Sequence, residues 1–302
     1  MATSPLLDVP LLPDGGDIGP MNSGFKLAFR EFAKNKLAVT GVGIVVFFIL
    51  FCFLGPVFYH GNVLVSNLLD TNASPGAGQP LGTNQQGFDE LGLLMKGGQS
   101  SLEVGFYAAF FGAALGTIYG AISGLAGGFV DAIMMRIVDV FLSLPYLFVV
   151  LVVAVKYGAT VLSLTLIIGS FTWPVPARLV RGEVLTLRTR DFVSAARVAG
   201  AKRTRLILKH LIPNAMGVVI VNVTFQIADA ILAVAALGFL GFGLVYPHQD
   251  WGDMLSTATL SMTDGYWWQI YPVGICIVLV VMACNLVGDA LRDSVDVRLR
   301  RR

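Results

Sequence analysis

Charged residues are scarce in this sequence. Asp, Glu, Lys and Arg make up 13% of its 302 residues, whereas hydrophobic residues make up 55%. A soluble domain carries about 25% charged residues, so the deficit is nearly twofold. This composition excludes a disordered chain, a nucleic-acid-binding arm and an ordinary soluble enzyme. It predicts a protein that crosses a membrane several times.

Residues that bind metals or catalyse reactions are also few. The three cysteines, Cys52, Cys276 and Cys284, lie in apolar runs, and the three histidines are scattered, so no metal-ligand spacing is present. No Gly-Lys dipeptide occurs, which excludes a Walker A phosphate loop, and neither the H-E-x-x-H nor the G-x-S-x-G motif occurs. We therefore expect no catalytic residue, no metal site and no cofactor bound by this chain.

Six apolar runs are long enough to cross a bilayer, and they predict an all-α membrane protein with six transmembrane helices. The runs are 37–59, 104–126, 137–155, 157–177, 213–243 and 270–288. They are continuous rather than alternating with polar residues, which excludes the strands of a β-barrel. The fifth run has 31 residues, and a straight helix of ~46 Å would exceed the ~30 Å hydrocarbon core. We expect a break or a membrane-entering return segment within it.

The positions of the basic residues predict the topology. With the amino terminus in the cytoplasm, 19 of the 21 Lys and Arg residues fall on the cytoplasmic side, and only Lys96 and Lys156 do not. The positive-inside rule then places both termini in the cytoplasm. The predicted division is a tail (1–36), a first helix (37–59), an extracytoplasmic loop (60–101), a helical core (102–290) with a basic loop (178–212), and a second tail (291–302).

Two features lie inside the apolar runs. Glycine recurs at every fourth position at Gly112, Gly116, Gly120 and Gly124, a stripe that lets another backbone approach closely. It serves either packing within the bundle or an interface that lines a path or meets a partner subunit. Asp229 lies deep in the fifth run, where an acidic residue usually faces a cavity or a partner. It either caps a helix after the expected break or lines such a path or interface.

The basic loop 178–212 contains nine Lys and Arg residues. Asp191 is a good helix N-cap, and Gly200 suits the position just after a helix, so about two turns of helix are expected between them. Ala195, Ala196 and Ala199 place small side chains on one side of it. Such a short helix is marginal alone. The loop therefore either contacts anionic lipid headgroups or carries a docking helix for a cytoplasmic protein.

The stretch S-A-A-R-V-A-G-A-K-R-T-R-L-I-L-K-H-L-I-P-N, Ser194–Asn214, resembles the E-A-A loop of ABC importer permeases. Ala196, Gly200 and Pro213 match that signature. The ending H-L-I-P-N, His210–Asn214, resembles the second, or "C", permease subunit of the dipeptide/oligopeptide/nickel importer family.

Further segments resemble the same family in the expected order, so the likeness covers about residues 29 to 300. They are Phe32–Gly41, Ser101–Gly105, Gly127–Val140, Pro145, Ala236–Gly243, Asp250–Leu255 and Asn285–Leu299. Three positions depart from the family pattern. Ser194 and Val234 stand where Glu is common, and Phe88 stands where an Arg is usual.

The resemblance implies a type I ABC importer permease with a MetI-like fold in the bacterial cytoplasmic membrane. It implies a non-catalytic subunit that carries peptides or a related small solute. The implied partners are a homologous permease in a heterodimer, two cytoplasmic ATPase domains that bind ATP and Mg, and an extracytoplasmic substrate-binding protein. The lipid bilayer surrounds the chain, and no nucleic acid is involved.

The resemblance also implies that the short helix in the basic loop couples the chain to the ATPases. The residues assigned to this coupling loop are Asp191, Ser194, Ala195, Ala196, Ala199, Gly200, His210, Pro213 and Asn214. The alternatives are an ATP-independent carrier or channel subunit, or a scaffold subunit without a path of its own. A carrier would need inverted repeats or several ionisable residues at mid-membrane, and Asp229 is the one good candidate.

Overall fold

A computed structural model describes residues 32–61 and 66–300, and its regular structure within those ranges is helical. Most of the predicted tail 1–36 lies outside the described residues. The helices are α2 (Lys36–Phe58), α3 (Glu90–Ala126), α4 (Gly128–Ser143), α5 (Tyr146–Tyr157), α6 (Val161–Thr172), α7 (Pro174–Leu187), α8 (Asp191–Val198), α9 (Arg203–Arg205), the π-helix η1 (Leu206–Leu211), α10 (Ile212–Phe239), α11 (Trp251–Thr259), the 3₁₀-helix η2 (Met262–Asp264) and α12 (Trp267–Arg300).

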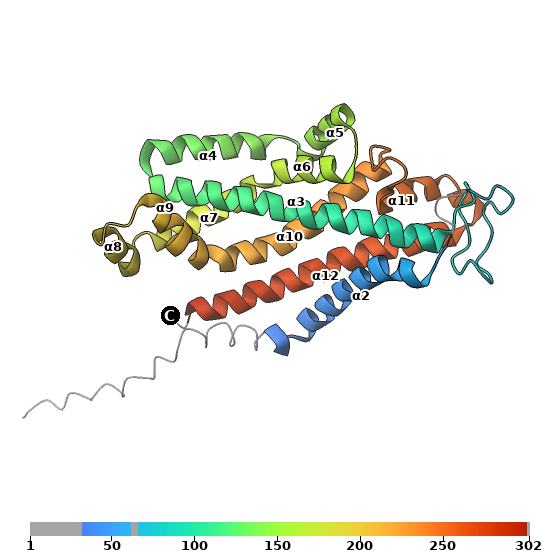
Figure 1. The fold of residues 1–302 in the computed structure, drawn as a ribbon, viewed down its shortest axis with the longest axis horizontal. Coiled ribbons are helices and arrows are strands. Elements are labelled where there is room, and N and C mark those ends of the chain that lie inside the picture. Colours follow the sequence, from blue (N-terminus) through green and yellow to red (C-terminus); the bar gives the residue numbers. More distant parts are fainter. Residues whose placement is uncertain (1–31, 62–65, 301–302) are drawn as a thin grey trace, which may run out of the picture.

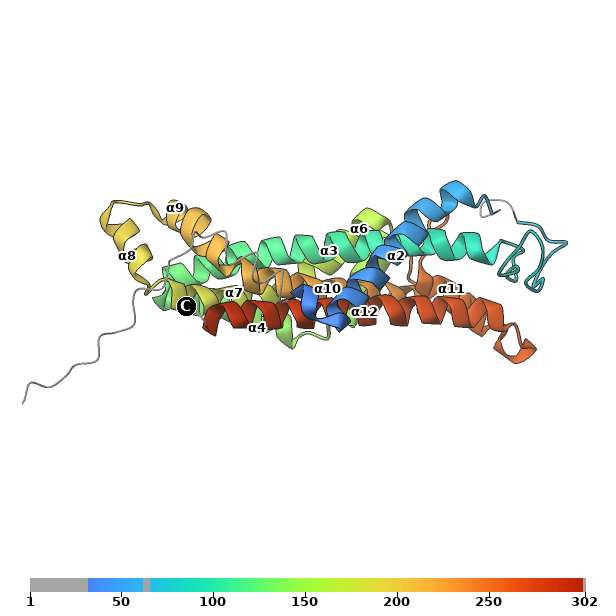
Figure 2. The same ribbon diagram turned by 90° about the horizontal axis from the view of Figure 1, so that it is seen from below.

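The long helix α3 lies at the centre of an elongated bundle (Figure 1). It contacts α6 and α7 on one side, α10 on another, and α2 near its beginning, while α12 packs against both α2 and α10. The end of α12 and the helices α8 and α9 lie at one end of the bundle (Figures 1 and 2). The loop before α3 and the helix α11 lie at the opposite end (Figures 1 and 2). The basic loop and the end of α12 therefore share one end of the bundle.

Four helices are long and apolar enough to cross a membrane: 36–58, 90–126, 203–239 and 267–295. A fifth span results if α4 and α5 are taken together, although they meet at 83°. The predicted third span, 137–155, therefore bends in its middle. The bend falls at Pro145, and Leu144 before it is extended (φ −77°, ψ 140°), as residues before proline usually are.

The predicted fourth span, 157–177, is likewise divided. Its residues form the end of α5, the 12-residue α6 and the beginning of α7, which starts at Pro174. Proline is favoured in the first turn of a helix and disfavoured in its interior. Within the described residues, helix length alone thus supports four or five crossings where the apolar runs predicted six.

The expected break in 213–243 is wrong. Helix α10 runs without interruption from Ile212 to Phe239 and continues η1 at its beginning. The apolar run exceeds the helix because its last residues form a turn, in which Gly241 has φ +81°. Asp229 accordingly lies in the interior of α10, so the alternative that it caps a second helix is excluded.

Helix α3 begins 14 residues before the predicted span 104–126. Asp89 is its N-cap and accepts a hydrogen bond from the backbone N–H of Gly92 at 2.6 Å. The predicted extracytoplasmic loop 60–101 is therefore helical over its last 12 residues. Helix α11 packs on this extension, where the buried Trp251 donates its indole N–H to the carbonyl of Leu94 at 3.0 Å.

Asp250 fixes the turn between α10 and α11. One oxygen of its carboxylate accepts the backbone N–H groups of Gly252 (2.8 Å) and Asp253 (3.0 Å), and the other accepts that of Leu244 (2.9 Å). The side chain is fully buried, and this burial raises the pKa of Asp250 to about 6. A carboxylate with three backbone donors holds both segments in place.

Candidate functional site

Helix α8 forms the outermost part of the basic loop. It begins at Asp191, and its N-cap is Arg190, whose backbone is extended (φ −73°, ψ 149°). The prediction that Asp191 is the N-cap is thus wrong by one residue. Asp191 lies in the first turn instead, where a negative charge interacts favourably with the helix dipole. Helix α8 ends before Gly200, whose φ of +78° is a conformation that favours glycine.

The small side chains of α8 do not all face the same way. Val193 is fully buried and Ala196 is half-buried, and both pack against a cluster that includes Leu206 and Leu211. Ala195 and Ala199 are exposed, as is Ser194. The most exposed apolar side chains are Val198 at 91% and Phe192 at 41%. One face of α8 therefore anchors the helix, and the other presents small and apolar groups outward.

The residues that follow α8 lead through a short turn, α9 and η1 into α10. Pro213 lies in the first turn of α10 and, having no N–H, cannot bond to a carbonyl one turn earlier. The π-helix η1 precedes it, and the side-chain amide of Asn214 donates to the carbonyl of His210 at 2.6 Å. Helix α8 is thus joined to α10 through α9 and η1, with a turn at Gly200 in between.

Two of the nine basic residues hold the base of this loop. The guanidinium of Arg181 on α7 donates two hydrogen bonds of 2.6 Å to the two carboxylate oxygens of Asp131 on α4, which also accepts the hydroxyl of Ser123. The guanidinium of Arg188 donates to the carbonyl of Gly124 at 3.0 Å. Helices α3, α4 and α7 are thus joined by charged hydrogen bonds next to α8.

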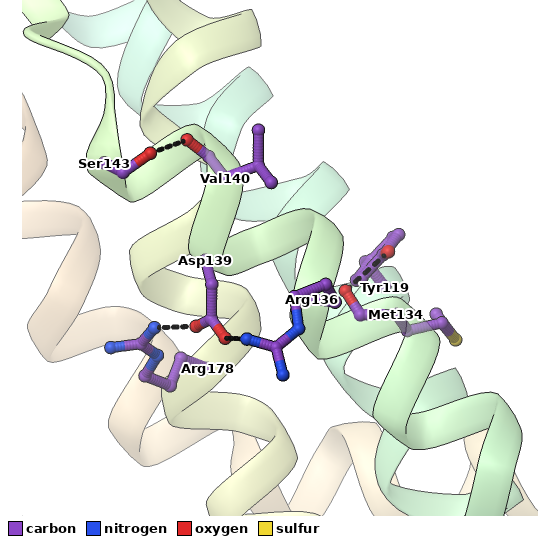
Figure 3. Close-up of polar contacts among 7 residues, drawn as sticks. All are labelled: Tyr119, Met134, Arg136, Asp139, Val140, Ser143 and Arg178. Carbon is purple, nitrogen blue, oxygen red and sulfur yellow. Dashed lines mark hydrogen bonds and ion pairs between the residues drawn. The ribbon is translucent and has the colours of Figure 1, made fainter.

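A second ion pair joins α4 and α7 closer to the surface. Asp139 on α4 lies between Arg178, at 2.6 Å, and Arg136, at 4.0 Å (Figure 3). The side chains of Arg178 and Asp139 are 54% and 47% exposed, against 30% and 11% for Arg181 and Asp131. The two pairs therefore have the same chemistry and different burial.

The glycine stripe of α3 faces α6 and α7 of the same chain. A Cβ atom at Gly116 would lie 2.5 Å from the carbonyl oxygen of Trp173, and one at Gly120 would strike the carbonyl of Ala177. Gly112 and Gly124 meet α6 and α7 in the same way. Of the two alternatives for these four glycines, the structure thus favours close helix packing within the chain over a path or a subunit interface.

Asp229 lies on the wall of a cavity of about 560 Å³. The wall is formed by the end of α4, the beginning of α5, the end of α6 and one face of α10. Most of the lining is apolar, and the polar residues include Tyr146, Asn222 and Gln226. Asp229 is the only charged residue among the lining residues.

Asn222, Gln226 and Tyr146 were not found from the sequence. Asn222 and Gln226 precede Asp229 by seven and three positions in an otherwise apolar run. That spacing places Asn222, Gln226 and Asp229 on one helix face. The helical period of polar residues could therefore have predicted Asn222 and Gln226 from the sequence. Asp131 and Arg181 are 50 positions apart, and no local pattern connects them.

A bundle of long apolar helices with a short exposed helix in a basic loop at one end and a partly polar cavity between its helices has the features of a transport permease. Residues 116–301 match the family model described as "Binding-protein-dependent transport system inner membrane component", and residues 23–75 match "N-terminal TM domain of oligopeptide transport permease C". The chain belongs to this family of transport permeases, the membrane components of ABC importers.

Curated relatives agree over most of the chain. The dipeptide transport system permease protein DppC of Bacillus subtilis is 37% identical over 91% of this chain and 86% of its own length. The oligopeptide transport system permease protein OppC of Escherichia coli is 36% identical over 89% of both chains. A solved structure of the MetNI methionine ABC transporter, inward facing, matches 67% of this chain and 96% of its own with a TM-score of 0.55 at 19% identity, which shows a shared fold.

Proposed function

We propose that this chain is one of two homologous permease subunits of an ATP-driven importer for dipeptides or oligopeptides, or for a related small solute. The observation that carries the proposal is α8, an eight-residue helix that is anchored by Val193 and presents Val198 and Phe192 outward. An exposed apolar helix at the end of a membrane bundle needs a partner to cover it. The printed names of the relatives support peptides as the substrate.

The proposed topology has six spans and both termini in the cytoplasm of a bacterial cell. In it the bent pair α4–α5 is the third crossing and α6 with α7 is the fourth. The basic loop and the end of α12 lie at the same end of the bundle, which fits the positive-inside distribution of Lys and Arg (Figure 1). Asp229 then lies within the fifth crossing and faces the path.

The proposed energy source is a pair of cytoplasmic ATPase domains, which bind ATP and Mg²⁺ and receive α8 in a groove. Closure of the ATPases would move α8, and its packing against η1, which continues into α10, would carry that movement to α10. Helix α8 would thus have two positions, and nucleotide binding to the ATPases would shift the equilibrium between them. A binding protein would deliver the substrate from the outside, and this chain would bind no cofactor itself.

The test is ATP-dependent uptake of a radiolabelled tripeptide by the complex of this chain with its partner permease and ATPases in proteoliposomes. Ala195 is exposed on α8, so Ala195→Trp leaves the core intact and obstructs docking. Uptake should fall by roughly tenfold or more with Ala195→Trp, a loss of at least ~1.4 kcal/mol of coupling. Ala195→Ser is the matched control and should retain uptake. Wild-type uptake by both Ala195→Trp and Gly200→Trp would contradict docking, and transport by this chain alone would favour a carrier.

A further inference from the structure

The cavity beside Asp229 has a polar side formed by a single helix face. Asn222, Gln226 and Asp229 are spaced at i, i+4 and i+7 on α10, so they stack along one side of it. Leu232 and Ala236 continue the same face and make it apolar. The cavity volume of about 560 Å³ lies within the range of about 300–1,000 Å³ typical of small-molecule sites.

Three buried polar atoms at this cavity have no hydrogen-bond partner among the described residues. They are the side-chain carbonyl oxygens of Asn222 and Gln226 and the hydroxyl of Tyr146. The Asn222 and Gln226 side chains are 9% and 5% exposed. Among the described residues seven buried side-chain atoms have no partner, and three of them gather at this one cavity. Buried polar atoms in native proteins nearly always have a partner, so this gathering points to a ligand-binding role.

The orientation of the Gln226 amide is fixed. Its nitrogen donates to the backbone carbonyl of Thr172 at 2.9 Å, and a carbonyl can only accept. The side-chain oxygen of Gln226 is therefore the atom left without a partner. It is an acceptor, as is that of Asn222, so the ligand must supply N–H or O–H donors.

Asp229 adds a negative charge to this set of acceptors. No basic side chain lines the cavity, and no hydrogen bond joins the Asp229 carboxylate to any residue that the structure describes. A cationic donor would complement it. The opposite wall, which includes Phe141, Phe171 and Leu147, is apolar and suits an uncharged side chain.

We propose that this cavity binds the primary ammonium group of a transported peptide's amino terminus, with Asp229 as the counter-ion and the Asn222 and Gln226 oxygens as acceptors for ammonium and amide N–H groups. The apolar wall receives the first side chain of the peptide. This inference rests on the proposed peptide transport and adds a requirement for a free amino terminus. The same ammonium chemistry occurs in the headgroup of phosphatidylethanolamine, and the experiments below separate the two sources.

The first experiment compares uptake of trialanine and N-acetyl-trialanine by the full transport complex in vesicles of phosphatidylcholine and phosphatidylglycerol. Acetylation removes the positive charge and leaves the rest of the peptide unchanged. We expect the wild type to prefer trialanine by roughly tenfold, as a charge-assisted hydrogen bond provides. Asp229→Asn should abolish that preference. The control Asp139→Asn removes a carboxylate outside the cavity and should keep it.

The outcomes separate this subsite from the transport function. Absence of ATP-dependent uptake of either peptide by the wild type would contradict the proposed function. Uptake in which Asp229→Asn keeps the wild-type preference would contradict the subsite alone, and transport by the importer would stand.

A second measurement does not depend on transport. In the complex with Cys52, Cys276 and Cys284 replaced by Ser, Asn222→Cys is labelled with a cationic or an anionic methanethiosulfonate reagent. The cationic reagent should react about tenfold faster, and Asp229→Asn should remove the difference. Trialanine should protect the thiol, and N-acetyl-trialanine should not. Equal rates for both reagents, or protection by phosphatidylethanolamine without peptide, would overturn the peptide subsite.

Discussion

The two long faces of this bundle differ in how closely their helices meet. On one face, the glycine stripe of α3 allows the backbones of α6 and α7 to pack directly against α3. Arg181, Arg188 and Arg178 form hydrogen bonds and ion pairs between α7 and its neighbours. On the other, α10 stands apart from the α4–α5 bend across a cavity with unpartnered polar atoms. On the packed face, the guanidinium groups of Arg181 and Arg188 find their acceptors within the chain. The hollow face leaves acceptors for something else to satisfy.

We infer from this difference that the packed face mainly stabilises the fold and that the hollow face mainly serves ligand binding. Close-packed interfaces resist deformation and can transmit a displacement as a unit. A cavity that keeps buried acceptors without partners lowers stability, and such sites are typical of ligand binding. We therefore expect substitutions on the packed face to unfold the chain, and substitutions on the hollow face to alter substrate handling with little loss of stability.

The largest effect is expected for Gly120→Leu. The new Cβ would strike the carbonyl of Ala177, which is backbone and cannot move aside without shifting α7. We expect a loss of more than about 3 kcal/mol, at or beyond the upper end of the usual range for overpacking. Thermal unfolding in detergent and the yield of folded chain measure it.

Gly182→Leu is the control for that prediction. Gly182 lies within α7, and no atom lies within 4 Å of a Cβ added there. Its substitution by Leu should change stability by less than about 0.5 kcal/mol. Equal losses for the two variants would show that the stripe has no special role in packing.

The two ion pairs between α4 and α7 provide the next largest effect. Arg181→Ala leaves the Asp131 carboxylate, only 11% exposed, without its partner, and should cost about 2–3 kcal/mol. Arg178→Ala breaks a pair whose side chains are about half exposed and should cost less than about 1 kcal/mol. Denaturation midpoints of both variants decide this. A larger loss for Arg178→Ala would contradict the importance of burial.

How far the sequence anticipates these two faces depends on the range of the interaction. The apolar runs predicted the helices, and the Asp191–Gly200 spacing predicted α8, because helix ends and hydropathy are local properties. The glycine stripe allowed two alternatives, and only the position of α7 decides between them. The pairing of Asp131 with Arg181 joins residues 50 positions apart, and hydropathy does not encode it.

Helix length misled the prediction for α10. A helix of 31 apolar residues would be longer than one crossing requires, which favoured a break. The helix is continuous instead, and the last residues of the apolar run form a turn around Gly241. The bend near Pro145 went unpredicted for the opposite reason. Proline interrupts a helix, but the 83° angle between α4 and α5 depends on which neighbours they pack against. The residues on both sides of this bend line the cavity.

Asp250 and Asp229 differ in the same way as the two faces. The Asp250 carboxylate accepts three backbone hydrogen bonds, and the Asp229 carboxylate accepts none from the described residues. The pKa of Asp250 is raised from its ordinary 3.8 to about 6 by burial, so the folded state binds its proton more tightly than the unfolded state. Its contribution to stability is complete below pH 3.8 and is lost as the pH rises through 6. Asp250 should contribute a loss of about 2 kcal/mol in the wild type between about pH 4 and pH 6.5. Asp250→Asn should show a smaller loss than the wild type in this window, because burial also raises the pKa of Asp253 in both proteins. Parallel slopes for the two proteins, measured by thermal unfolding, would contradict this assignment.

The smallest effect concerns Asn222, and its sign distinguishes the hollow face from the packed one. Because the Asn222 side-chain oxygen is buried without a partner, Asn222→Leu removes an unsatisfied acceptor and should leave stability unchanged or raise it by up to about 1 kcal/mol. Asn214→Leu is the matched control, since the Asn214 amide donates to the carbonyl of His210 at 2.6 Å and its loss should lower stability by about 0.5–1.5 kcal/mol. Unfolding of both variants in detergent measures the difference. If Asn222→Leu proves as destabilising as Asn214→Leu, Asn222 stabilises the fold, and its unpartnered oxygen is no evidence for ligand binding. If Asn222→Leu is neutral or stabilising while peptide uptake falls, the unpartnered amide is retained for transport at the expense of stability.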